Sequence, residues 1–247
     1  MPGLEKFTNP YDRRAKLYPM VITLLPLALG LAAWSPPQFR IQGVLASALV
    51  AVAAAALLTQ LARDQGKKRE PSLFRQWGGR PSDRALSYAG GVYPAPTLAR
   101  RHRALSKMDP KLKFPKSSEA ELATPEAWLP VYASATDLLL AKTRDHGKFA
   151  LLFQENINYG YRRNLWGMKP AGILACLVGL AASGTHLTLD LLADRSPSSA
   201  AIAGAGVCIV LLVLWCLRVT PSWVRIPADA YAKHLAECCD RIGEPAS

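Results

Sequence analysis

Acidic residues are scarce in this chain, and charge of either sign is missing from several long apolar stretches. Asp and Glu number 18 against 30 Lys and Arg, which gives a formal net charge of +12 over 247 residues. Half of the residues are hydrophobic, yet the mean hydropathy is only +0.09. Apolar and charged residues are therefore segregated into blocks, whereas a soluble helical protein mixes them at helical spacing. The pattern excludes an ordinary soluble domain.

The five cysteines form neither a disulfide framework nor a metal site. Three of them fall in apolar runs, where thiols behave as small hydrophobic side chains, and Cys238 and Cys239 are adjacent. The sequence has no CxxC pair, no Cys/His metal spacing and no phosphate-binding glycine loop. We therefore expect no metal and no cofactor. No catalytic constellation is present either, and an enzyme using Glu155 or His146 is the weakest interpretation.

Four apolar stretches are long enough to cross a bilayer as helices, at residues 17–34, 41–62, about 170–187 and about 199–217. A helix needs about 20 apolar residues to span a hydrocarbon core of roughly 30 Å. The first stretch follows basic residues, as a signal peptide would. It contains Pro19 and Pro26 but no small-residue cleavage site, so we expect it to be retained. None of the four contains Asp, Glu, Lys or Arg, which argues against an ion-coupled transporter.

The distribution of charge predicts the topology. Residues 63–169 hold 20 of the 30 basic residues, and the two short connections within the apolar pairs hold only Arg40 and Arg195. Because Lys and Arg stay on the cytoplasmic side, both termini and the central segment should face the cytosol of a bacterial inner membrane. We expect an all-α membrane protein, with four transmembrane helices as two hairpins and a small, mostly helical cytoplasmic domain between them. Its predicted parts are a basic leader (1–16), hairpin one (17–62), the basic domain (63–169), hairpin two (170–217) and an amphipathic cytoplasmic tail (218–247).

An arginine pair precedes the first and the third apolar stretch. Arg13 and Arg14 stand before the first, and Arg162 and Arg163, followed by Trp166, stand before the third. Arginine side chains reach lipid phosphates and tryptophan rings favour the headgroup depth. We predict that these five residues lie at the membrane interface, in contact with anionic lipids.

Small residues recur every fourth position in the last two apolar stretches, at Ala171, Ala175, Gly179 and Ser183 and again at Ala200, Gly204 and Cys208. Such stripes let helix backbones approach closely in lipid, so we predict a packed interface. His186 and Asp190 are four apart and can pair if the helix continues to that point.

A basic run begins at residue 100 and contains seven Lys and Arg up to residue 116, with only Asp109 opposing them. Attraction to the anionic leaflet, worth about 1 kcal/mol per cation, is one interpretation. Binding of phosphate groups in a ligand or nucleic acid is the other. Aromatic residues do not alternate with these cations, so base stacking has little support and nucleic acid is not the expected partner. The candidate ligand-binding residues are Arg100, Arg101, Arg103, Lys107 and, beside a Gly-Gly pair, Arg80.

Further helices are predicted at residues 124–144 and 148–166, the second running into the third apolar stretch. The tail has an amphipathic helix from Pro227 to Ile242. That helix can dock against the central domain or lie on the bilayer, and the sequence leaves both open.

In layout, with Trp-Gly-Gly-Arg-Pro at 77–81 and Tyr-Arg-Arg at 161–163 as its most distinctive motifs, the chain resembles small four-span proteins of the bacterial inner membrane. The architecture is also similar to that of membrane effectors of nucleotide-signalling antiphage systems, a resemblance that implies no residue roles. The expected function is that of a binding or effector protein. Its basic domain would engage an anionic ligand or partner and act through an oligomerising transmembrane bundle. The alternative is a non-catalytic scaffold or an accessory subunit of a larger membrane complex.

Overall fold

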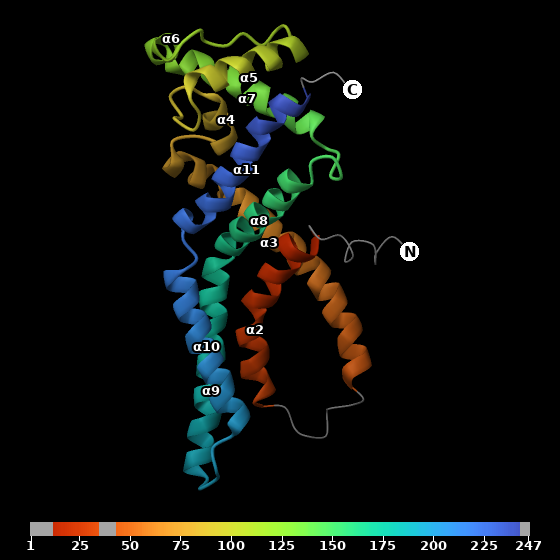
Figure 1. Cartoon of the computed structure of the whole chain (residues 1–247). Helices are drawn as coiled ribbons and strands as arrows, with labels where there is room; N and C mark the ends of the chain where they lie inside the picture. The colour runs from red at the N-terminus through yellow and green to blue at the C-terminus, as the bar shows by residue number, and fades with distance from the viewer. Residues whose placement is uncertain (1–11, 35–42, 243–247) are drawn as a thin grey trace. The chain divides into compact units, whose positions relative to one another are not determined.

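The computed structural model describes residues 12–34 and 43–242, and every regular element in this part of the chain is a helix, as predicted (Figure 1). A turn of π-helix, η1 (Asp12–Leu17), is followed by α2 (Tyr18–Ala32), α3 (Gly43–Trp77), α4 (Pro81–Leu86), α5 (Ala95–Met108), α6 (Ser118–Ala123), α7 (Pro125–Lys142), α8 (Ala150–Gly167), α9 (Lys169–Leu192), α10 (Ser199–Leu217) and α11 (Pro221–Ile242).

The chain divides into two compact units. Unit 1 comprises Met1–Glu70 and Gly160–Val224, and unit 2 comprises Pro71–Tyr159 and Arg225–Ser247. Unit 2 begins after the predicted start of the basic domain at residue 63, because α3 continues without a break from the apolar stretch to Trp77. A charged residue such as Arg63 ends an apolar run, but it does not end a helix.

Three helical segments of unit 1 are long and apolar enough to cross a membrane: Arg13–Leu31, Lys169–Leu192 and Ser199–Leu217. They indicate a membrane protein. The last span has the predicted bounds, whereas α9 extends past the predicted end at residue 187. The remaining predicted span, 41–62, begins outside the described residues, and the backbone is helical from Gly43 onward.

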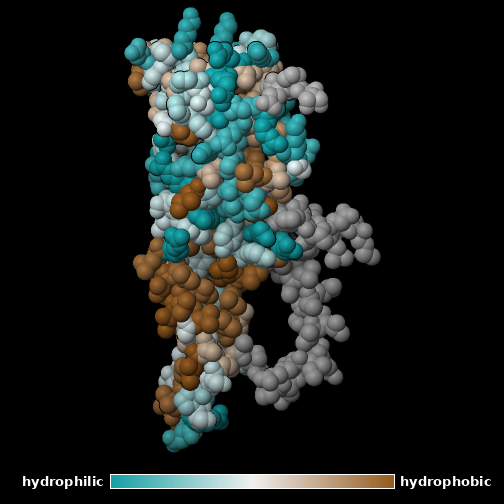
Figure 2. Space-filling view, in the orientation of Figure 1, coloured by the Kyte–Doolittle hydropathy of each residue, from teal (hydrophilic) through white to brown (hydrophobic). Residues whose placement is uncertain are grey.

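Large apolar side chains of α9 and α10 point outward. Leu174 is 62% exposed, Leu217 is 76% exposed, and Ile209 and Val210 are also more than half exposed. Figure 2 shows hydrophobic surface gathered over these helices. In water so large an apolar surface would be unfavourable, whereas lipid tails accept it without cost.

The predicted small-residue interface is present, and it joins α9 to α10 and α2 of the same chain. A Cβ atom at Gly179 would lie 2.5 Å from the Pro26 carbonyl oxygen and 2.8 Å from the Cys208 sulfur. A Cβ atom at Gly204 would lie 3.2 Å from the Ser183 hydroxyl. These small residues therefore let three helices meet backbone to backbone. Ala171 and Ala200, the first members of the two stripes, are exposed.

Near the C-terminal end of α9, the predicted pair forms within one helix. The His186 Nδ1 atom lies 3.1 Å from an Asp190 carboxylate oxygen, which also accepts the backbone N–H of Ser198 at 3.0 Å. Asp190 thereby fixes the turn that leads into α10.

The two arginine pairs have different surroundings. Arg13 and Arg14 are exposed, and Arg162 donates to the Trp223 carbonyl at 3.0 Å while lying over the Trp223 ring. Trp166 is half-buried beneath Arg69.

Arg163 was predicted to lie at the membrane interface in contact with lipids. The structure instead buries its side chain within unit 1. It donates to a Glu70 carboxylate oxygen at 2.9 Å and to the Asn164 side chain, and Asn164 donates to the Ala15 carbonyl at 2.8 Å. Burying a guanidinium requires a paired carboxylate, and α3 supplies it through its continuation past the apolar stretch.

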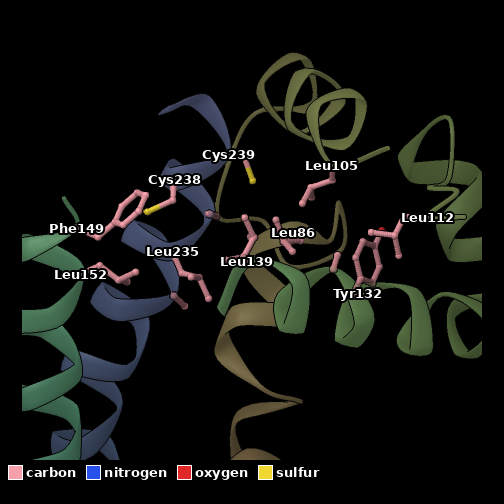
Figure 3. Close-up of a cluster of buried hydrophobic side chains, with 14 residues drawn as sticks. Leu86, Leu105, Leu112, Tyr132, Leu139, Phe149, Leu152, Leu235, Cys238 and Cys239 are labelled. Carbon is pink, nitrogen blue, oxygen red and sulfur yellow. The ribbon is translucent and has the colours of Figure 1, made fainter. Parts of the chain in front are cut away.

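The hydrophobic core of unit 2 draws on α4, α5, α7, α8 and α11 (Figure 3). The tail helix α11 contributes Ala232, Leu235, Ala236, Cys238 and Cys239, all buried. The question left open by the sequence is thus decided: the tail helix completes the core of unit 2 rather than remaining apart from it. Burial raises the pKa of the Cys239 thiol to about 12, so this cysteine packs as an unreactive apolar group.

Candidate functional site: a basic cavity beside α5

Helix α5 carries the first four cations of the basic run, and they lie on two different faces of the helix. Leu98, Arg101, His102 and Leu105 are buried, which is the spacing of one helix face turned to the core. Arg100, Arg103 and Lys107 are exposed on the other side. The helical period therefore divides four cations that are neighbours in sequence into groups with different roles.

Arg100 and Arg101 share one carboxylate partner. Both guanidinium groups donate to Asp240 of α11, at 3.0 Å from Arg100 and at 3.0 and 3.2 Å from Arg101. Arg101 is only 4% exposed and also lies 4.0 Å over the Tyr93 ring. Burial opposes the charge of Asp240, but the bonds from the two arginines outweigh it and lower the pKa of this carboxyl group. Arg100 and Arg101, which were predicted to bind a ligand, thus pair with Asp240 and hold α11.

This shared partner gives a matched pair of variants. We expect Arg101→Gln to reduce the stability of unit 2 by about 2–3 kcal/mol, because it leaves a partly buried carboxylate without its main partner. Arg100→Gln removes an exposed ion pair and should cost about 1 kcal/mol or less. Pulse proteolysis in urea measures both. Equal losses would show that burial of Arg101 does not matter for the pair.

Arg80 also has partners within unit 2. It follows Gly78 and Gly79, whose positive φ angles of 76° and 123° are conformations that favour glycine. Its guanidinium donates to an Asp137 carboxylate oxygen at 3.3 Å. The Gly-Gly turn therefore serves to join α3 to α4, and it leaves Arg80 bound to α7.

The two remaining predicted residues, Arg103 and Lys107, line a cavity of about 460 Å³. Its wall is formed by Tyr88, Ala99, His102, Arg103, Ser106, Lys107, Phe114, Pro115 and Lys116. Three of these side chains are cationic. Among the described residues, Arg103, Lys107 and Lys116 have no carboxylate within ion-pair distance, in contrast to Arg80, Arg100 and Arg101. The cavity is therefore lined by three cations without an ion-pair partner among the described residues.

An aromatic cluster forms another part of the same wall. The His102 ring stacks on Phe114 with a centroid distance of 4.2 Å and an interplanar angle of 8°, and Tyr88 meets it edge-on at 5.2 Å. These rings could not be recognised as part of a site from the sequence, because Tyr88 comes from the loop after α4 and Phe114 from the segment after α5. Only the fold brings them beside the cations.

His102 is 5% exposed, and only one of its two ring nitrogens forms a hydrogen bond within the described residues. Its Nε2 atom lies 2.6 Å from the Leu86 carbonyl oxygen, so this nitrogen must carry the hydrogen. Burial lowers the pKa of the imidazole below its usual value of 6.5, so the ring is neutral at pH 7. Its Nδ1 atom is then a hydrogen-bond acceptor, and it has no partner in the described part of the chain.

A buried carboxylate holds the loop that carries Tyr88. Glu121 of α6 is 4% exposed and accepts hydrogen bonds from the Ser87 hydroxyl, from the backbone N–H of Tyr88 at 2.8 Å and from the Tyr132 hydroxyl at 2.7 Å. It thereby ties one wall of the cavity to α7. In the sequence Glu121 is one acid among several in a polar segment, and no local signal distinguishes it.

A second cavity of about 350 Å³ is lined by Arg84, Arg225 and Lys233, but it also contains an acid, Asp229. Arg84 donates to the Trp77 carbonyl at 2.7 Å and Arg225 pairs with Asp229, which leaves Lys233 as its one cation without a described partner. His146 stacks on Phe153, and Glu155 accepts a bond from Asn158, so neither lines the α5 cavity. Within the described residues no cluster of three or more His, Cys, Asp or Glu could hold a metal ion.

Comparison of the chain with protein families, with curated proteins and with solved structures found no match.

Proposed function

We propose that this is an integral inner-membrane protein that works by binding a small anionic ligand in the α5 cavity. The observation that carries the proposal is the set of three cations, Arg103, Lys107 and Lys116, around a cavity without an acidic partner among the described residues. Clustered unpaired cations repel one another, and an anion relieves that repulsion while gaining charge-assisted hydrogen bonds.

The proposed topology has four spans, the second at residues 41–62, with both termini and unit 2 in the cytosol. The excess of Lys and Arg in residues 63–169 supports this orientation. In the cytosol the cavity would meet soluble anions directly. Anionic lipid headgroups remain partners of the exposed Arg13 and Arg14 at the span entrance.

Continuity of the helices provides a route from binding to the spans. Helix α8 supplies residues to unit 2 and to unit 1, and a single residue, Met168, separates it from the span α9. A ligand that orders unit 2 could thereby bias the helices of unit 1. Since the small-residue stripes pack within the chain, an oligomer would use other faces of the spans, such as the exposed apolar side of α10.

Pyrophosphate is a suitable first probe, because it supplies negative charge and no ring. We expect the full-length protein in phosphatidylcholine nanodiscs to bind it, and the double substitution Arg103→Gln and Lys107→Gln to weaken binding about 150-fold, since each charged hydrogen bond contributes about 1.5 kcal/mol. Isothermal titration calorimetry measures the affinity, and it should fall steeply with added salt.

Lys111→Gln with Lys113→Gln is the matched control. Both lysines are exposed in the segment that follows α5, and neither lines the cavity. Equal weakening by the two double variants would show a general charge effect rather than a site. Nanodiscs with added phosphatidylglycerol test whether lipid headgroups compete for the cavity. Absence of any anion binding would leave the scaffold or accessory subunit as the better description.

A further inference from the structure

The size of the α5 cavity limits what can fill it. Its volume of about 460 Å³ falls in the range of roughly 300–1,000 Å³ in which proteins bind organic small molecules. A single inorganic anion occupies only a small part of such a space. If the cations bind a phosphate or carboxylate, as proposed above, most of the cavity remains for the rest of the ligand.

The chemistry of the wall differs from one part to another. Arg103, Lys107 and Lys116 provide charge, whereas Tyr88 and Phe114 provide aromatic surface around the His102 ring. Flat rings gain stacking energy on such surfaces, and saturated sugars or flexible chains gain less. A ligand that satisfies both parts is an anion attached to a ring.

We propose that the α5 cavity binds a phosphorylated aromatic compound, the class to which the common nucleotides belong. The phosphate lies among Arg103, Lys107 and Lys116, and the ring lies against Tyr88 and Phe114. This inference rests on the proposed function, because it requires that the cavity binds anions at all.

The test compares ligands that differ only in the ring, using the full-length protein in nanodiscs and the monophosphates AMP, GMP, CMP and UMP as probes. We expect at least one of them to bind about 10-fold or more tightly than ribose 5-phosphate, which has the same phosphate and sugar. The corresponding nucleoside, which lacks the phosphate, should bind at least about 10-fold more weakly than that nucleotide.

Phe114→Leu keeps an apolar side chain and removes the ring. It should reduce the advantage of the nucleotide over ribose 5-phosphate to about 3-fold or less, and an unchanged urea midpoint in pulse proteolysis reports an intact fold. If ribose 5-phosphate and all four nucleotides bind equally, the ring site is refuted and the proposed anion site stands. If neither these compounds nor pyrophosphate bind, both proposals are refuted.

Discussion

Replacing Gly179 with alanine should reduce the stability of the packed helices in unit 1 by about 3 kcal/mol, the upper part of the range for overpacking. The added methyl group would lie 2.5 Å from the Pro26 carbonyl oxygen and 2.8 Å from the Cys208 sulfur. The first of these atoms belongs to a backbone, so the strain cannot be relieved by a change of side-chain rotamer. Helix α2 would have to move away from α9, and other close contacts between them would be lost with it.

Unfolding by sodium dodecyl sulfate in mixed micelles, followed by circular dichroism, measures this loss. Gly184→Ala and Gly206→Ala are matched controls in the same spans, because a methyl group at either position would meet no atom within 4 Å. Both should be neutral or slightly stabilising, since alanine favours helix more than glycine does. If Gly179→Ala behaved like these controls, the close approach of α2 to α9 would be disproved.

Glu121→Ala should be similarly damaging in unit 2, with an expected loss of about 3–4 kcal/mol. The substitution removes a buried carboxylate and leaves four donors without an acceptor: the Ser87 hydroxyl, the backbone N–H groups of Tyr88 and Ala89, and the Tyr132 hydroxyl. Each unsatisfied buried donor costs about 1–3 kcal/mol, and partial access of water to the loop reduces the sum. Because Tyr88 belongs to the wall of the cavity, ligand affinity should fall as well.

Glu119→Ala tests whether the effect is specific, because Glu119 is an exposed acid in the same helix. Pulse proteolysis in urea should find a change of less than about 0.5 kcal/mol for this variant, as is usual for surface sites. Tyr132→Phe removes one donor from Glu121 and should cost about 1–2 kcal/mol. A small effect of Glu121→Ala would mean that the loop carrying Tyr88 is held by other contacts.

Much of the layout was predictable because its signals are local. The apolar stretch 199–217 has no charged residue, and α10 has these bounds in the structure. The stripes through Gly179 and Gly204 predicted a packed face, and both glycines are buried in it. Length, hydropathy and small-residue spacing act within one helix, so they can be read without knowing the fold.

Which cations form buried ion pairs and which line the cavity was not predictable in the same way. Arg101 and Arg103 are two residues apart in one basic run, yet one is buried against Asp240 and the other lines the cavity. Arg163 was predicted to lie at the membrane interface, but the fold places Glu70 of α3 beside it as an ion-pair partner. Each of these acids is distant in sequence, and no pattern in the run itself indicates where they lie.

The sequence by itself determined the helical class, the apolar segments and the excess of positive charge in the middle of the chain. These properties follow from hydrophobic free energy and chain length, which depend on composition over about 20 neighbouring residues. The tertiary structure alone decided which cations remain without a partner, which rings stand beside them and how the tail helix completes the core. Ion pairing and stacking depend on distances of a few ångströms between segments far apart in sequence, and only the folded chain fixes those distances.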